Sequence, residues 1–143
     1  MTANPQTRVL HGSAAGVYIN GKLDDLTTKI EAKITGDFAD QNFCGDYATY
    51  PVYNGYSGEG TLTDMKEDSV LEQAIVRGYE TGAMPDITLI TYMTNPNTRK
   101  TERWSYMGVV FTEVALANVE AKSPVERELP FKFTRAQLLE VID

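Results

Sequence analysis

The sequence contains very few of the residues that catalytic and metal sites use most often. Cys44 is its only cysteine and His11 its only histidine. An intrachain disulfide is therefore excluded, and a zinc site, which takes about four sulfur or imidazole ligands, would lack donors. A Cys-His nucleophile pair would have to form from two irregular segments, and no neighbouring residue activates the thiol. We expect Cys44 to be a half-buried structural residue, and we expect no catalytic site, no metal and no cofactor.

Long hydrophobic runs and an excess of basic charge are also missing. The sequence has no apolar segment long enough to span a membrane and no cleavable secretory start. The net charge is −7, and the segment from Asp37 to Glu72, with eight acidic residues and the single base Lys66, accounts for it. Such a chain lacks the basic surface of a nucleic-acid-binding protein, so DNA passing nearby would meet a repulsive or slippery surface. A solvated acidic face that aids solubility is the simpler explanation of the same charges.

The length of 143 residues predicts one compact domain. Polar and turn-forming residues near the N-terminus indicate a flexible arm over residues 1–13, which leaves residues 14–143 for the domain. Alternation of apolar and polar residues predicts antiparallel strands. Ala15–Asn20 precedes an Asn-Gly hairpin turn, and Leu26–Thr35 places Ile30, Ala32 and Ile34 on one face. The other strands predicted in this way are Asp86–Thr94, Thr101–Thr112, Val114–Lys122 and Val125–Thr134.

The tract Tyr53–Thr63 has a distinctive glycine alternation. Gly58 and Gly60 fall on one face, and the residues between and around them are polar. A strand of this kind has a bare face that lies close against another backbone. It builds a sheet surface, and it indicates assembly rather than chemistry.

Residues 36–56 interrupt the strand pattern and predict a long loop. Tyrosines recur there at every third position, from Tyr47 to Tyr56, and this period suits neither a strand nor an α-helix. Long loops without regular structure are usually functional or pack on a partner, and tyrosine is favoured at interfaces. The alternative is that these rings cap the core of the domain itself.

One helix is predicted near residues 69–79. Ser69-x-x-Glu72 has the spacing of a capping box, and it directly precedes apolar residues at helical spacing. Gly78 and Gly82 are candidate ends, and Pro85 excludes continuation. The fold class predicted from these patterns is mainly β: an antiparallel β-sandwich or barrel with one packed α-helix and six or seven strands.

Five motifs occur in a characteristic order and spacing: GVYINGK (Gly16–Lys22), GYSGEGTLT (Gly55–Thr63) with a helix opening at Ser69, PDITLI (Pro85–Ile90), Glu102-Arg103 before a strand, and ERELPFKF (Glu126–Phe133). Together they resemble the motifs of the phage tail tube proteins of contractile tails, found in phages, PBSX-like prophages and R-type bacteriocins. The resemblance covers most of the chain, and the chain departs from the family in the aromatic, acidic content of residues 37–56.

The resemblance implies a structural, non-enzymatic subunit of a virion tail or bacteriocin particle, made in the host cytoplasm. Such proteins form hexameric rings that stack into a hollow tube inside a sheath, and their sheets join between subunits into a continuous inner barrel. Implied partners are further copies of the chain, the tail sheath protein, the tape-measure protein, and baseplate, initiator and terminator proteins. DNA would only pass through the tube, and the chain itself would not insert into a membrane.

Two sets of residues follow as candidates for assembly. Strand alternation combined with an inner barrel predicts a polar, lumen-facing set: Lys29, Glu31, Lys33, Glu59, Thr61, Thr63, Glu126, Glu128 and Lys132. The irregular, aromatic segment predicts an inter-ring set: Asp37, Phe38, Asp40, Phe43, Asp46, Tyr47, Tyr50 and Tyr53.

Other functions remain open at this point. A monomeric β-barrel or sandwich that binds a soluble ligand or carbohydrate would also use tyrosine-rich loops. An enzyme is the weaker alternative because no catalytic constellation is present. A related tail-tip or injection-system tube would share the fold.

Overall fold

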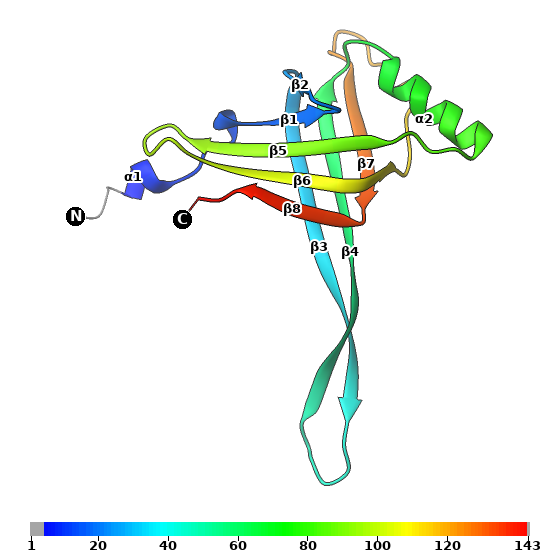
Figure 1. The fold of residues 1–143 in the computed structure, drawn as a ribbon. Coiled ribbons are helices and arrows are strands. Elements are labelled where there is room, and N and C mark those ends of the chain that lie inside the picture. The colour runs from blue at the N-terminus through cyan, green and yellow to red at the C-terminus, as the bar shows by residue number, and fades with distance from the viewer. Residues whose placement is uncertain (1–4, 143) are drawn as a thin grey trace.

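The computed structural model describes residues 5–142, which form an antiparallel β-structure with one helix packed against it (Figure 1). Part of the predicted arm, residues 1–4, lies outside the described residues. The remainder of the arm contains a short helix and part of a 3-10 turn. The elements in chain order are α1 (Pro5–Arg8), a 3-10 turn (Gly12–Ala14), β1 (Ala15–Ile19), β2 (Lys22–Asp24), β3 (Thr27–Asn42), β4 (Thr49–Met65), α2 (Val70–Thr81), β5 (Ile87–Asn95), β6 (Lys100–Phe111), β7 (Glu126–Phe133) and β8 (Arg135–Glu140).

The strands form two layers that cross one another (Figure 1). One layer contains β2, β1, β5, β6 and β8, and the other contains β3, β4 and β7. Strand β6 belongs to both, because its first part pairs with β5 and β8, and its end pairs with β7. The core lies between the layers, where Val17, Leu62, Leu89, Leu129 and Phe131 are almost fully buried. This arrangement confirms the predicted class, a mainly β antiparallel fold with a packed helix.

Helix α2 begins and ends close to the predicted bounds, but for a different reason at its start. Ser69 is the N-cap residue, yet its side chain makes no capping hydrogen bond. Glu72 does not reach back to the N-cap, because its buried carboxylate pairs with Arg127 and Lys66. The predicted capping box is therefore wrong in mechanism. The helix ends at Gly82, whose φ of 79° is the left-handed conformation that glycine adopts without strain.

The predicted loop at residues 36–56 is wrong, because most of that segment belongs to β3 and β4. The two strands form a hairpin whose pairing runs from Thr27↔Asp64 to Asn42↔Thr49. The register shifts where Asp37 pairs with Gly55 and Phe38 with Tyr53, so Asn54 is an extra residue in β4. A one-residue bulge reverses the phase of a strand. It puts Tyr53 and Tyr56 on the same face despite their three-residue spacing, whereas Tyr50, which pairs with Gln41, lies on the opposite face and Tyr47 lies between the two strands.

In the C-terminal third one predicted strand is absent, and one observed strand was not predicted. The predicted strand Val114–Lys122 has no regular structure, and Leu116 and Val119 are 72% and 75% exposed. Alanine alternation is a weak strand signal, because alanine has little surface to pack against neighbouring strands. Strand β8, for which the sequence gives no strand signal, pairs with β6 although Ala, Leu and Glu favour helices. Tertiary pairing decides both segments.

Candidate assembly surfaces

Eight of the nine residues of the predicted polar set, all but Glu126, are direct cross-strand neighbours of one another on β3, β4 and β7. Lys29 pairs with Thr63, and Thr63 pairs with Glu128, so these three form one row across the sheet. The next rows are Glu31, Thr61 and Pro130, then Lys33, Glu59 and Lys132; Glu126 pairs with Met65 at the end of the sheet. Because alternate residues of a strand share a face, the whole set lies on one side. We call this surface the polar face.

The opposite side of the same three strands packs into the core. Its rows contain Ile30, Leu62 and Leu129, then Ala32, Gly60 and Phe131. The sheet is therefore amphipathic, as the alternation predicts. The polar face is mostly exposed, and Thr63, at 8% exposure, is its only buried member. The Lys33–Glu59 ion pair on this face has its charged atoms 3.5 Å apart and is exposed, so it adds little stability.

The glycines of β4 allow neighbouring backbone and phenylalanine rings to pack directly against the core side of this strand. A Cβ atom at Gly60 would overlap the Glu31 carbonyl oxygen and lie 2.7 Å from the Phe131 ring, and one at Gly58 would overlap the Phe133 ring. The predicted bare face therefore exists, and it is covered by phenylalanines of β7 as well as by backbone. This contact requires glycine because the obstructing atoms at position 60 include backbone, which cannot rotate away.

Substitution of Gly60 by alanine is expected to lower the free energy of unfolding by about 1–3 kcal/mol, the usual cost of overpacking. Urea denaturation of dilute protein measures it. Gly12→Ala is the matched control, because a Cβ atom there would meet nothing within 4 Å and its φ is not positive. Equal stability of the two variants would show that β4 and β7 are not packed as described.

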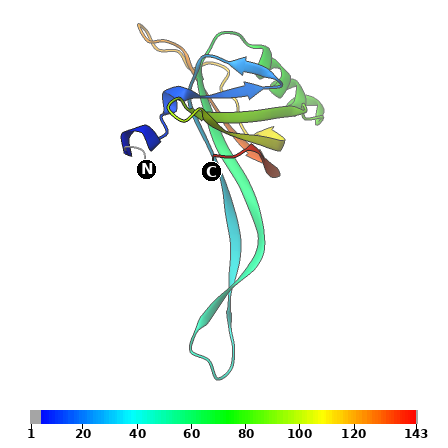
Figure 2. The ribbon, with the colours of Figure 1, turned by 60° about the vertical axis from the view of Figure 1, so that its left-hand side comes forward.

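The second candidate surface is the outer part of the β3–β4 hairpin, residues 36–56, which extends away from the body (Figures 1 and 2). All eight residues of the predicted inter-ring set lie there, and all are exposed. None belongs to the core, so these tyrosines do not cap the domain that carries them. The rings instead pair edge to face with each other, Phe38 with Tyr53 and Phe43 with Tyr50. An isolated two-stranded hairpin is only marginally stable in water, so this surface suits a partner.

The apolar side of the hairpin continues the core side of the sheet. Ile34, Phe38, Tyr53 and Tyr56 share this side and are 51%, 57%, 56% and 49% exposed. Further out, the Tyr50 hydroxyl donates a hydrogen bond to Asp46. This bond and the Ala48 N–H, which also donates to the Asp46 carboxylate, lower the pKa of Asp46. Cys44 is exposed at the same tip, so the expectation of a half-buried cysteine is wrong.

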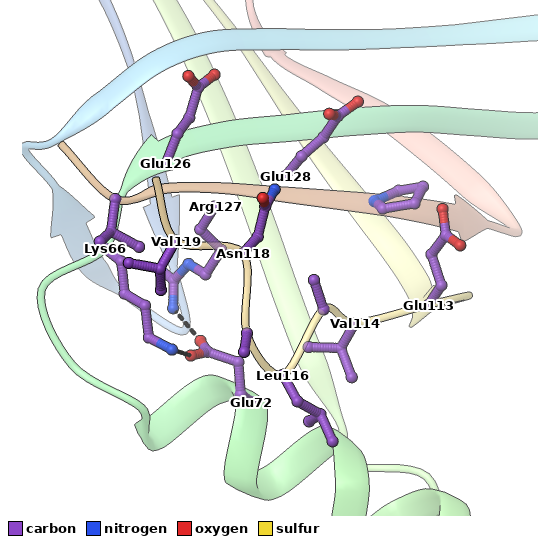
Figure 3. Close-up of a pocket in the computed structure, with 14 residues that line it drawn as sticks. Lys66, Glu72, Glu113, Val114, Leu116, Asn118, Val119, Glu126, Arg127 and Glu128 are labelled. Carbon is purple, nitrogen blue, oxygen red and sulfur yellow. Dashed lines mark hydrogen bonds and ion pairs between the residues drawn. The ribbon is translucent and has the colours of Figure 1, made fainter. Parts of the chain in front are cut away.

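A buried ion-pair cluster joins the helix to this sheet. Arg127 of β7 lies opposite Asp64 of β4, with Nε 2.8 Å from Oδ1 and Nη2 2.6 Å from Oδ2. Its Nη1 donates to Glu72 of α2, whose other oxygen lies 3.1 Å from Lys66 (Figure 3). Burial raises the pKa of Asp64, whereas its hydrogen bonds with Arg127 act in the opposite direction.

Sequence reasoning missed this cluster, although a signal was present. Arg127 falls on the apolar phase of its strand, between Val125 and Leu129, and Asp64 falls on the phase of Leu62. A charged residue on the core side of a strand needs a buried partner of opposite charge. Two such residues on strands that pair with each other indicate an internal ion pair.

The described residues contain no cluster of His, Cys, Asp or Glu side chains arranged to hold a metal ion. Neither α-helix in residues 5–142 has the length and apolar character needed to cross a bilayer. What the molecule presents instead is two extended surfaces and an open strand edge. Within the described sheet β3 pairs only with β4, so sixteen residues of its outer edge lack a strand neighbour. Long open edges are templates for pairing with another chain.

Comparison with known proteins identifies the family and the fold. No curated protein matches the chain by sequence. The fold is similar to that of a chain in the sheath-tube complex of the extracellular contractile injection system PVC in its extended state. That pair has a TM-score of 0.75 and 13% identity, over 99% of this chain and 100% of that one.

Two other solved structures have the same fold. The tube terminating cap of the anti-feeding prophage gives a TM-score of 0.73 at 8% identity, covering 99% of this chain and 95% of that one. The SPP1 tail tube gives 0.68 at 11% identity, covering 94% and 81%. The model of the phage tail tube protein family matches residues 3–140, nearly the whole chain. The chain therefore belongs to the phage tail tube protein family and is a structural component of a tail or tail-like particle.

Proposed function

We propose that this tail tube protein polymerises as stacked hexameric rings that form the inner tube of a contractile tail. The tube is a hollow conduit that the sheath drives through a target cell envelope. The observation that carries the proposal is the amphipathic β3-β4-β7 sheet, which has one polar face, one core face and an open edge at β3. An edge that pairs with the next subunit closes a ring and leaves no strand unpaired.

In this arrangement the polar face lines the lumen. A sheet whose other side packs into the core of the subunit can present only its polar side to the channel. The face carries the bases Lys29, Lys33 and Lys132 and four acids, so it is nearly neutral with a small negative excess. Such a surface holds passing nucleic acid weakly, because adhesion to phosphates needs an excess of basic charge. DNA passage is therefore transient and non-specific.

The outer hairpin makes the contact between rings. A heterologous interface that does not close on itself generates a filament, so a tube needs a second surface besides the ring interface. The hairpin extends from the body, exposes aromatic rings and contributes nothing to the core. Tyrosine and phenylalanine are enriched at the centres of protein interfaces.

Partners beyond the chain itself are proposed from the similar structures. One similar chain comes from a structure of a sheath-tube complex, another from a structure of a sheath and tube terminator, and a third from a structure of a baseplate. By analogy we assign contacts with sheath, terminator and baseplate proteins, and a tape-measure protein inside the tube. No enzymatic activity is part of the proposal.

Negative-stain electron microscopy of the purified chain at high concentration tests the function. The expected result is rings or hollow tubes of uniform width. Monodisperse small particles, together with specific binding of a soluble ligand or sugar, would contradict the proposal and favour a monomeric binding module.

Assembly is expected to depend strongly on ionic strength. Each subunit carries a net charge of −7, so bringing subunits together costs electrostatic repulsion that salt screens. We expect the critical concentration for tubes to fall as salt is raised from about 0.01 M to 0.15 M, over which the Debye length falls from about 30 to 8 Å. Pelleting assays across this range measure it. A critical concentration independent of salt would indicate a purely apolar interface.

A further inference from the structure

Charge is distributed very unevenly over the two projecting parts of the molecule. The outer hairpin, residues 36–56, contains three acids, Asp37, Asp40 and Asp46, and no base. Asp40 is two residues from Phe38 on the same strand and therefore shares its face, on which Phe38 also meets Tyr53. This face thus combines negative charge with exposed aromatic rings.

The opposite combination occurs where α1 and the β5–β6 turn meet. Arg8 ends α1, and Arg99 lies in the turn; both are exposed. The buried Asn95 connects the two segments. Its side-chain Nδ2 donates a hydrogen bond to the backbone carbonyl of Thr7 at 2.9 Å, and its backbone carbonyl accepts one from the N–H of Arg99 at 2.7 Å. The neighbouring Val9 is 69% exposed. We call this surface, formed by α1 and the β5–β6 turn, the basic end.

We propose that the outer hairpin of one copy docks on the basic end of a copy in the adjacent ring, with Asp40 facing Arg8 and Arg99. This inference rests on the proposed function, and it names the receiving surface for the hairpin. Charge complementarity carries it, since an acidic aromatic surface and a basic aliphatic surface occur on the same molecule. Complementary charges fix the register of an interface and exclude wrong pairings.

The contact has to join two copies. In Figures 1 and 2 the hairpin and the basic end leave the body in different directions, so the hairpin does not reach the basic end of its own chain. A contact between two different surfaces of identical subunits is heterologous and propagates along a polymer. The stacking of rings requires this kind of contact.

Arginine suits such a receiving surface better than lysine, because its planar guanidinium stacks on aromatic rings while it pairs with a carboxylate. The chain already uses this arrangement internally. The Arg103 guanidinium carbon lies 5.8 Å from the Tyr18 ring centroid and 5.9 Å from that of Tyr92, while its Nε pairs with Glu140. Arg99 and Arg8 would meet Asp40 and the Phe38–Tyr53 pair in the same manner across the interface.

A charge-swap series tests the proposal. Asp40→Lys is expected to raise the critical concentration for tubes about tenfold, which corresponds to loss of one interfacial charge pair. This variant changes the net charge from −7 to −5, so a purely global repulsion would instead favour assembly. Arg99→Asp is expected to have a similar effect alone, and the double variant is expected to return to within about twofold of the wild type.

The matched control is Lys122→Asp. Lys122 is exposed and has a φ of 62°, close to the 58° of Arg99, but it lies in the loop between β6 and β7. Lys122→Asp must not rescue Asp40→Lys. Rescue by Lys122→Asp, or absence of rescue by Arg99→Asp, would overturn the proposal.

Cys44 at the hairpin tip provides a second, independent readout. Thr98→Cys places a thiol beside Arg99, and Ser123→Cys places one beside Lys122. Cys44 lies four residues from Asp40, up to about 13 Å along the hairpin, which is too far for a disulfide to a thiol beside Arg99 but within reach of a bismaleimide cross-linker of that length. Treatment of assembled tubes with this cross-linker is expected to give a ladder of linked chains with Thr98→Cys and none with Ser123→Cys. If tubes form but the ladder appears with Ser123→Cys, or does not appear with Thr98→Cys, the proposed docking is contradicted. If no tubes form from the wild-type chain, the proposed function itself fails.

Discussion

Replacement of Arg127 by methionine is expected to lower the free energy of unfolding by about 3–5 kcal/mol, the cost of removing one partner from a buried ion pair. Asp64 is completely buried and Glu72 is 5% exposed. Arg127 donates three hydrogen bonds to these two carboxylates. Without it, Asp64 would be a buried carboxylate with no positive charge beside it. Urea denaturation of dilute, unassembled protein measures the loss.

The pH dependence of this loss identifies its cause. Burial already raises the pKa of Asp64, and removing Arg127 removes the interaction that opposes the rise. When the pKa of a carboxyl is higher in the folded state than its ordinary value of 3.8, the free energy of unfolding of the protein rises as the pH falls through the folded pKa, because the folded state binds the proton more tightly. The variant is therefore expected to recover part of its stability between pH 7 and about pH 5. A loss that does not change with pH would indicate missing packing rather than an unpaired charge.

Lys33→Met is the control for this experiment, since it breaks an ion pair whose side chains are 58% and 53% exposed. Its expected cost is below about 1 kcal/mol. If Arg127→Met cost no more than Lys33→Met, the cluster would not hold α2, β4 and β7 together.

Removal of the outer hairpin is expected to abolish tube formation without unfolding the domain. Thr35 pairs with Ser57, so replacing residues 36–56 by Asn-Gly closes the strands with a two-residue turn. No residue of the removed segment belongs to the core. We expect a folded monomer and a critical concentration raised at least about 100-fold, because several aromatic contacts of interface quality are lost.

Fluorescence of the single tryptophan, Trp104, reports whether the truncated chain is folded, because this residue packs against the core and lies outside the hairpin. A second variant, Phe38→Ser with Tyr53→Ser, keeps the hairpin but removes its paired rings. Its critical concentration for tube formation is expected to lie between those of the wild type and the truncated chain. Normal tubes from the truncated chain would refute an inter-ring role for the hairpin.

Sequence reasoning succeeded where the local pattern and the tertiary structure agree. The Asn20-Gly21 turn has positive φ at both residues, as a tight hairpin requires. The glycine alternation of β4 and the polar alternation of β3 and β7 predicted both sides of one sheet correctly. In each case a period of two reflects a strand with one covered face.

It failed where distant contacts or an irregularity decide the structure. The bulge at Asn54 changes the phase between Tyr53 and Tyr56, and a strand with this irregularity lacks the period of two by which the sequence would reveal it. Strand β8 exists because β6 offers an edge to it, and its own residues carry no strand signal. Glu72 matched a capping motif, but the positive charges of Arg127 and Lys66 outcompete a backbone N–H for its carboxylate. Local motifs cannot reveal such competition.

In the proposed hollow tube, the polar face of β3, β4 and β7 lines the lumen. A cryo-electron microscopy map of tubes assembled from the purified chain tests this arrangement. We expect rings joined through the open edge of β3, with the side chains of Glu31, Lys33, Glu59 and Lys132 pointing into the channel. A map in which these side chains lie on the outer surface, or in which β3 pairs with no neighbouring subunit, would contradict the account.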